Sequence, residues 1–190
     1  MHRACLAAAL ALSAFVTLGT GSALAQANFD RPGGDYATVQ LPSGDPADCA
    51  LMCERDRRCR AWSFRYPGLD DAGTERPGPT MIAACWLKNT VPERVPGLAS
   101  VSGVRGAGVI ELRNSAIEMS TDRPGGDYRN ITIEGSPNGD ACKAACEGDD
   151  KCRAWTYARP GYAGSAAHCF LKNQIKPPAR RPGMISGVVR

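Results

Sequence analysis

Residues 49–62 read CALMCERDRRCRAW, and residues 142–155 read CKAACEGDDKCRAW. In both stretches three residues separate the first two cysteines, five separate the next two, and Arg-Ala-Trp follows the third. Similarity repeated at a fixed distance along a chain indicates a duplicated structural unit. The sequence therefore predicts two copies of one small module.

The repeat extends to both sides of these stretches. An Asp-Arg-Pro-Gly-Gly-Asp-Tyr sequence occupies residues 30–36 and 122–128, and a Cys-aromatic-Leu-Lys-Asn sequence occupies residues 85–89 and 169–173. Each copy spans about 70 to 80 residues, a size at which a hydrophobic core alone is marginal and covalent cross-links are common. We assign residues 26–112 to module 1 and residues 113–190 to module 2.

The first 25 residues have the composition of an export signal. A basic start precedes an apolar run from Cys5 to Leu18, and Ala23-Leu24-Ala25 forms a small-x-small cleavage site. The apolar run is about 14 residues long, shorter than the ~18 to 20 residues that span a bilayer. We therefore assign residues 1–25 to a signal peptide and expect a soluble, secreted or periplasmic protein that is monomeric and has no membrane span.

Composition excludes several classes of protein. The formal net charge is only +4, and basic residues are either interrupted by an acid, as in residues 55–60, or limited to the pair Arg180-Arg181. Nucleic-acid binding proteins tend to have dense basic surfaces, so no nucleic-acid partner is expected. The 14 prolines and 21 glycines favour short elements and many turns over a large helical or doubly wound enzyme domain.

Each copy carries four cysteines, which could form disulfides or bind zinc. Structural zinc sites usually bring cysteines in pairs two to four residues apart, and each copy has only one such pair. An even number of cysteines in an exported protein favours disulfides. We therefore expect two disulfides in each module, no metal and no cofactor.

The local pattern narrows the pairing of these cysteines. Residues 45–55 are predicted to form a helix that carries Cys49 and Cys53 on one face, about 5 to 6 Å apart at Cβ, which is too far for a direct disulfide. Two pairings remain: Cys49–Cys85 with Cys53–Cys59, or Cys49–Cys59 with Cys53–Cys85. We favour the first, which nests a short loop inside a long one. Its equivalent in the second copy is Cys142–Cys169 with Cys146–Cys152.

The segments around the third and fourth cysteines are expected to be strands. If side chains alternate from Cys59 onward, Cys59 and Ala61 face the helix and the aromatic residues face away from it. The aromatic residues concerned are Trp62, Phe64 and Trp86, with Trp155, Tyr157 and Phe170 in the matching places. This aromatic face would be either a second small core or a partly open binding platform.

Taken together, the Cys-x3-Cys helix, the x5-Cys strand, the Cys-aromatic-Leu-Lys-Asn strand and the final Ser-Gly-Val of each copy resemble the PAN/Apple module. The resemblance implies an α+β fold in which a curved antiparallel sheet cradles one helix, and it implies the first of the two disulfide pairings. The third disulfide of blood-protease Apple domains has no cysteines here. The resemblance further implies non-catalytic binding to proteins or carbohydrates. Similar modules also accompany macroglobulin-like protease traps, so a structural or accessory role in such a system is an alternative.

A glycan hydrolase is the competing catalytic function. It would need a carboxylate pair such as Asp35 and Asp127, but each lies in a Pro-Gly-Gly-Asp-Tyr sequence that is typical of a turn. His168, the only histidine after the signal, is interpreted as an exposed loop residue, and it leaves no catalytic triad that both copies could share. We therefore expect no enzymatic activity.

A ligand site is expected where the two copies differ, because the features they share are explained by their common fold. The segment between the third and fourth cysteines is nine residues longer in the first copy. Its residues 67–83 are rich in turn-forming residues and should lie at the surface. The predicted ligand-binding residues in this segment are Arg65, Tyr66, Arg159 and Tyr162. Further charged residues are available there: Asp70, Asp71, Glu75, Arg76 and His168.

Overall fold

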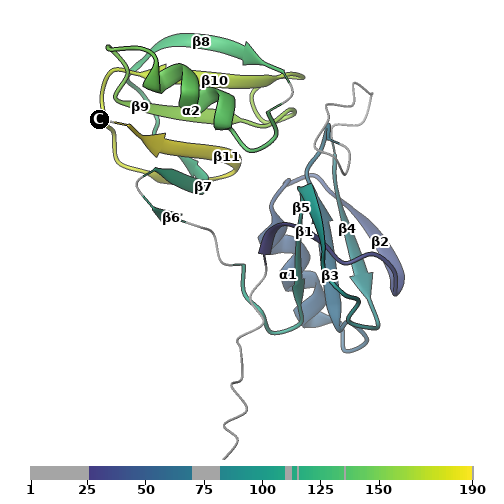
Figure 1. Ribbon diagram of the computed structural model, residues 1–190. Coiled ribbons are helices and arrows are strands. Elements are labelled where there is room, and N and C mark those ends of the chain that lie inside the picture. The colour runs from purple at the N-terminus through teal and green to yellow at the C-terminus, as the bar shows by residue number, and fades with distance from the viewer. Residues whose placement is uncertain (1–25, 70–81, 110–112, 115, 135, 190) are drawn as a thin grey trace, which may run out of the picture.

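The computed structural model describes residues 26–69, 82–109, 113–114, 116–134 and 136–189. The predicted signal peptide at 1–25 and the charged residues between 70 and 76 lie outside these ranges. Figure 1 shows two units, each with one helix against one face of an antiparallel sheet. In the described ranges, no helix is long and apolar enough to cross a membrane.

Module 1 contains five strands and one helix. The sheet has the order β1-β5-β3-β4-β2, and every neighbouring pair is antiparallel. Its elements are β1 (Gln26–Asp30), β2 (Asp35–Leu41), α1 (Pro46–Arg55), β3 (Ala61–Arg65), β4 (Ala83–Lys88) and β5 (Val95–Val104).

Module 2 repeats this arrangement and adds a short edge strand. Its sheet has the order β6-β7-β11-β9-β10-β8, so β7 and β8 take the places of β1 and β2. The elements are β6 (Arg113–Asn114), β7 (Ile117–Asp122), β8 (Asp127–Ile133), α2 (Asp140–Glu147), β9 (Ala154–Ala158), β10 (Ala167–Lys172) and β11 (Ala179–Val188). The predicted α+β fold with one helix on each sheet is confirmed. A division of the chain between residues 112 and 113 stays a prediction, with the first sheet ending at Val104 and the second beginning at Arg113.

The disulfides join each helix to its sheet. The pairs are Cys49–Cys85, Cys53–Cys59, Cys142–Cys169 and Cys146–Cys152, so the nested pairing is confirmed in both modules. One bond in each module runs from the helix to the strand β4 or β10, with Cα atoms 5.6 and 5.4 Å apart. The other closes the turn after the helix. The eight cysteines of these four bonds are fully buried, so the disulfides form part of each core.

The predicted direction of the aromatic side chains is wrong for β3 in module 1 and for β9 in module 2. Phe64 lies directly opposite Cys85 in the β3–β4 ladder, and Trp62 lies opposite Leu87. Because residues directly opposite share a face and Cys85 is bonded to the helix, Phe64 and Trp62 pack under α1. Trp155 and Tyr157 do the same under α2. Trp86 and Phe170 are on the other face, as predicted.

Candidate binding site

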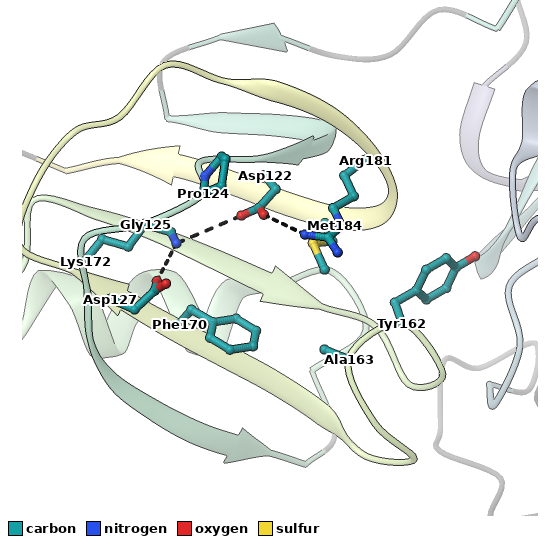
Figure 2. Close-up of a pocket in the computed structure, with 10 residues that line it drawn as sticks. All are labelled: Asp122, Pro124, Gly125, Asp127, Tyr162, Ala163, Phe170, Lys172, Arg181 and Met184. Atoms are coloured by element: carbon teal, nitrogen blue, oxygen red, sulfur yellow. Dashed lines mark hydrogen bonds and ion pairs between the residues drawn. The ribbon is translucent and has the colours of Figure 1, made fainter.

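A pocket of about 310 Å³ opens on the second module. It lies on the sheet face that points away from α2, because Phe170 and Lys172 alternate along β10 with Cys169 and Leu171, which face the helix. The turn between β7 and β8 and the start of β11 complete it (Figure 2). Its lining includes the side chains of Asp122, Asp127, Lys172, Arg181, Phe170, Met184 and Tyr162.

Lys172 forms the ionic floor of the pocket. Its side chain is only 2% exposed, and its ammonium contacts the Asp127 carboxylate and lies 3.9 Å from that of Asp122. Asp122 in turn accepts a hydrogen bond from the Arg181 guanidinium at 3.2 Å. Burial of an ammonium is costly unless carboxylates compensate it, so these three contacts hold one another in place. The dashed lines of Figure 2 follow this chain of contacts.

The walls of the pocket are mixed in character. Phe170 and Met184 provide apolar surface, and Tyr162 stands at the edge with its hydroxyl directed away from the floor (Figure 2). The Arg181 side chain is 60% exposed, so its guanidinium can donate to a bound group while it keeps its contact with Asp122. An apolar wall beside a few fixed polar groups is the usual build of a small-ligand site. The chemistry offered is hydrogen bonding to a polar group together with packing against an aromatic ring.

Module 1 contains the same lysine and carboxylate. Lys88 is as buried as Lys172, contacts the Asp35 carboxylate, and donates to the Gly33 carbonyl oxygen at 3.3 Å. The pair therefore belongs to the shared fold, where it ties the Pro-Gly-Gly turn to the end of a central strand. Asp35 and Asp127, the carboxylates of the hydrolase alternative, are each engaged by the lysine of their own module.

The predicted ligand residues are divided between two environments. Tyr66 and Arg159 occupy equivalent positions directly after β3 and β9, and they are only 4% and 1% exposed. They contact each other between the modules, with the Arg159 guanidinium carbon 4.2 Å from the centre of the Tyr66 ring. Arg65 is half-buried and lies over the Trp86 ring of its own module. Of the four, Tyr162 lines the pocket. Ligand binding by these four residues stays a prediction.

Two more contacts join the modules close to the pocket. The Tyr162 hydroxyl donates to the Gly44 carbonyl oxygen at 2.6 Å, and burial raises the pKa of this phenol. Arg180 donates to both carboxylate oxygens of Asp45, at 2.8 and 2.9 Å. Burial opposes ionisation of Asp45, but the hydrogen bonds from Arg180 and from the Ala47 backbone outweigh it, so the pKa of this carboxyl is lowered. These hydrogen bonds therefore join the surfaces of the two modules through partly buried polar groups.

Other residues of the site differ from what the sequence indicated. His168 is half-buried within β10, beside Phe170, so its interpretation as an exposed loop residue is wrong. Sequence reasoning also missed the pocket residues Arg181 and Met184 and the contact residue Arg180. A signal for them existed, because β11 begins Ala-Arg-Arg-Pro-Gly-Met where β5 begins Val-Pro-Gly-Leu-Ala-Ser. Within the described ranges no group of His, Cys, Asp and Glu side chains could hold a metal ion.

Comparison with known proteins finds the PAN domain in both modules. The model of that family matches residues 29–88 and 121–172, more than half of the chain. Among solved structures, the chain is similar to the two N-terminal apple domains of microneme protein 4 from Toxoplasma gondii. The identity is 18% over 87% of this chain and 89% of that one, with a TM-score of 0.30. No curated protein matches the chain.

Proposed function

Because the chain belongs to the PAN domain family, we propose that it is an exported, non-catalytic protein that binds a protein or carbohydrate partner. Modules of this family are generally binding domains. Four disulfides in two small modules are typical of proteins in oxidising compartments, which agrees with the signal peptide predicted at residues 1–25. Residues 26–112 and 113–190 would then form the two modules of the mature protein.

The pocket of module 2 is the observation that carries this proposal. It offers donors on Arg181, acceptors on Asp122 and Asp127, and the ring of Phe170 within one small cavity. Hydroxyl groups of a sugar can use both donors and acceptors, while the apolar face of the sugar ring can pack on an aromatic side chain. The pocket suits one polar unit of a larger partner, such as a sugar residue of a glycan or a polar side chain of a protein.

The four predicted ligand residues enter this proposal in different ways. Tyr162 would touch the ligand directly, because it stands at the pocket edge. Tyr66 and Arg159 are buried, so their effect on a ligand would pass through the placement of Tyr162. Arg65 lies over Trp86 in module 1 and would contact only a partner large enough to span both modules.

The alternatives have less support in the structure. A hydrolase would need two carboxylates that act on one bond, whereas Asp35 and Asp127 each pair with a lysine of their own module. An accessory role beside a protease trap would require a protein partner with no small ligand. That role is tested by the same binding measurements.

The test is binding of a panel of neutral, acidic and amino sugars, measured by saturation-transfer NMR. We expect at least one sugar to bind without being converted, and Arg181→Ala to weaken it about tenfold or more, the effect of one charge-assisted hydrogen bond. The matched control is Arg57→Ala, which removes the same charge from an exposed position of module 1. If no sugar binds, a protein partner whose affinity falls in Arg181→Ala would assign the pocket to protein recognition, whereas a partner bound equally well by that variant would favour the accessory role. Conversion of a sugar would contradict the proposal.

A further inference from the structure

The contact between the modules is built at positions where the two copies differ. Tyr66 and Arg159 are equivalent residues, each four positions after the tryptophan of the Cys-Arg-Ala-Trp sequence. When equivalent positions of a duplicated unit meet, identical residues would face each other. Two arginines would repel, whereas a guanidinium over a tyrosine ring is attractive and is strengthened by burial. The difference between the copies therefore makes this contact complementary.

Tyr162 fills a slot that both modules form. Its ring lies between Gly44 of module 1 and Gly183 of module 2, where an added Cβ would approach the Tyr162 side chain to 2.5 and 2.2 Å. The ring packs against the hydrophobic core of module 1, and its centre is 6.3 Å from that of Tyr66 in an edge-to-face arrangement. The equivalent residue in module 1, Leu69, is buried in its own module's core. Only glycine leaves room for this tyrosine at both places.

The ion pair between Arg180 and Asp45 is the third contact. Asp45 already caps helix α1 by accepting a hydrogen bond from the Ala47 amide at 2.9 Å, so its carboxylate is held in place before Arg180 reaches it. Arg180 then donates to both oxygens, the geometry that makes arginine–carboxylate pairs strongest. In module 1 a proline, Pro96, stands at the position of Arg180.

We infer that the segments in which the modules differ recognise each other, so that the two modules form one rigid unit and module 1 positions Tyr162 at the pocket of module 2. Three contacts from the end of β9, the loop before β10 and the start of β11 meet module 1 at separate points, which resists rotation about any single one. The consequence for the pocket rests on the proposed function. The docking of the modules does not.

Docking is tested on the full-length chain by ¹⁵N relaxation, which reports the tumbling time of each module. We expect one common tumbling time in the unchanged protein. Gly44→Ala should separate the two times, because its methyl group meets the Tyr162 hydroxyl. Gly33→Ala is the matched control: Gly33 also has a positive φ, of 88°, but nothing lies within 4 Å of an added Cβ. Independent tumbling in the unchanged protein, or equal behaviour of the two variants, would overturn the inference.

A second variant guards against misfolding of Gly44→Ala. Asp45→Asn keeps a residue that caps helices well but removes the charge that pairs with Arg180, so it should loosen docking while α1 remains folded. The effect on the pocket is then measured with the best-binding sugar of the panel. Gly44→Ala should weaken that sugar about threefold or more, whereas Gly33→Ala should not. Unchanged affinity in an undocked variant would overturn the positioning of Tyr162, and absence of any sugar binding would contradict the proposed function while the tumbling result still decides docking.

Discussion

In module 1 a buried lysine, Lys88, meets Asp35 beneath a Pro-Gly-Gly turn, and in module 2 Lys172 meets Asp127 in the same way. An arginine of each turn donates to a backbone carbonyl across the module, Arg31 to Pro92 and Arg123 to Lys176. Such shared contacts hold each module together. The residues that differ, by contrast, face the other module or the pocket, as Tyr66, Arg159 and Arg180 show. Duplication thus preserved the fold and left the positions at its edge free to become complementary.

The largest expected effect is the loss of a helix-to-strand disulfide. Changing Cys49 and Cys85 together to Ser, or Cys142 and Cys169, should lower the free energy of unfolding of that module by about 2 to 5 kcal/mol. This is comparable to the whole stability of a small domain. The two bonds close loops with sequence separations of 36 and 27 residues, and the loop-closure contributions to stability differ by only about 0.3 kcal/mol. Both modules should therefore respond alike. Urea unfolding followed by NMR resolves the two modules.

A strong asymmetry between these two double variants would contradict the equivalence of the modules. Cys53–Cys59, whose loop is far shorter, provides an internal scale, because its loss should cost less than that of Cys49–Cys85.

The next effect distinguishes the two lysine sites. Asp35→Ala should cost about 2 to 3 kcal/mol, below the ~3 to 5 of a fully buried pair because the aspartate is 37% exposed. Asp127→Ala should cost less, because Lys172 keeps Asp122 as a second carboxylate 3.9 Å away. Thermal unfolding of the two variants measures the difference. Equal losses would mean that Asp122 does not compensate Lys172.

A smaller effect is expected between Tyr66 and Arg159. In a double-mutant cycle with Tyr66→Leu and Arg159→Met, the coupling energy should be about 1 to 2 kcal/mol, the range for a cation over a ring that is shielded from water. The same cycle between Arg65 and Trp86, a cation–π contact within module 1, serves as the comparison. Its coupling should be lower, about 0.5 to 1 kcal/mol, because Arg65 is less buried.

The smallest effect is that of pH on the Asp45–Arg180 pair. The pKa of Asp45 is lowered in the folded protein, so its contribution is present above the ordinary value of 3.8 and is lost as the pH falls through the lowered pKa. The pair is partly exposed, and a cycle with Asp45→Asn and Arg180→Gln should give about 0.5 to 1 kcal/mol near neutral pH. Tumbling times recorded from pH 6 to about pH 2 should separate only at the acid end. Separation already near pH 6 would show that another group controls docking.

Residues close together in the sequence were enough to predict the modules themselves. The local pattern of residues 45–55 predicts helix α1, and the Cys-x3-Cys spacing of both copies disfavours a bond within one helix, because four residues make about one helical turn. The prediction of where the aromatic side chains of β3 point is wrong for a local reason. Cys59 precedes β3 (Ala61–Arg65), so alternation counted from it does not give the faces of that strand, whereas Cys85 lies within β4 and sets the face correctly.

The pocket and the contact between the modules could not be read from local patterns. The sequence by itself determined where the two copies differ, and Arg65, Tyr66, Arg159 and Tyr162 lie in the segment of that difference. Only the tertiary structure decided what these residues face, because the bonds from Tyr162 to Gly44 and from Arg180 to Asp45 span 118 and 135 residues. Periodicity and spacing specify an element and its faces over a few turns of chain. The meeting of two such faces depends on how whole modules pack, and no short stretch of sequence encodes it.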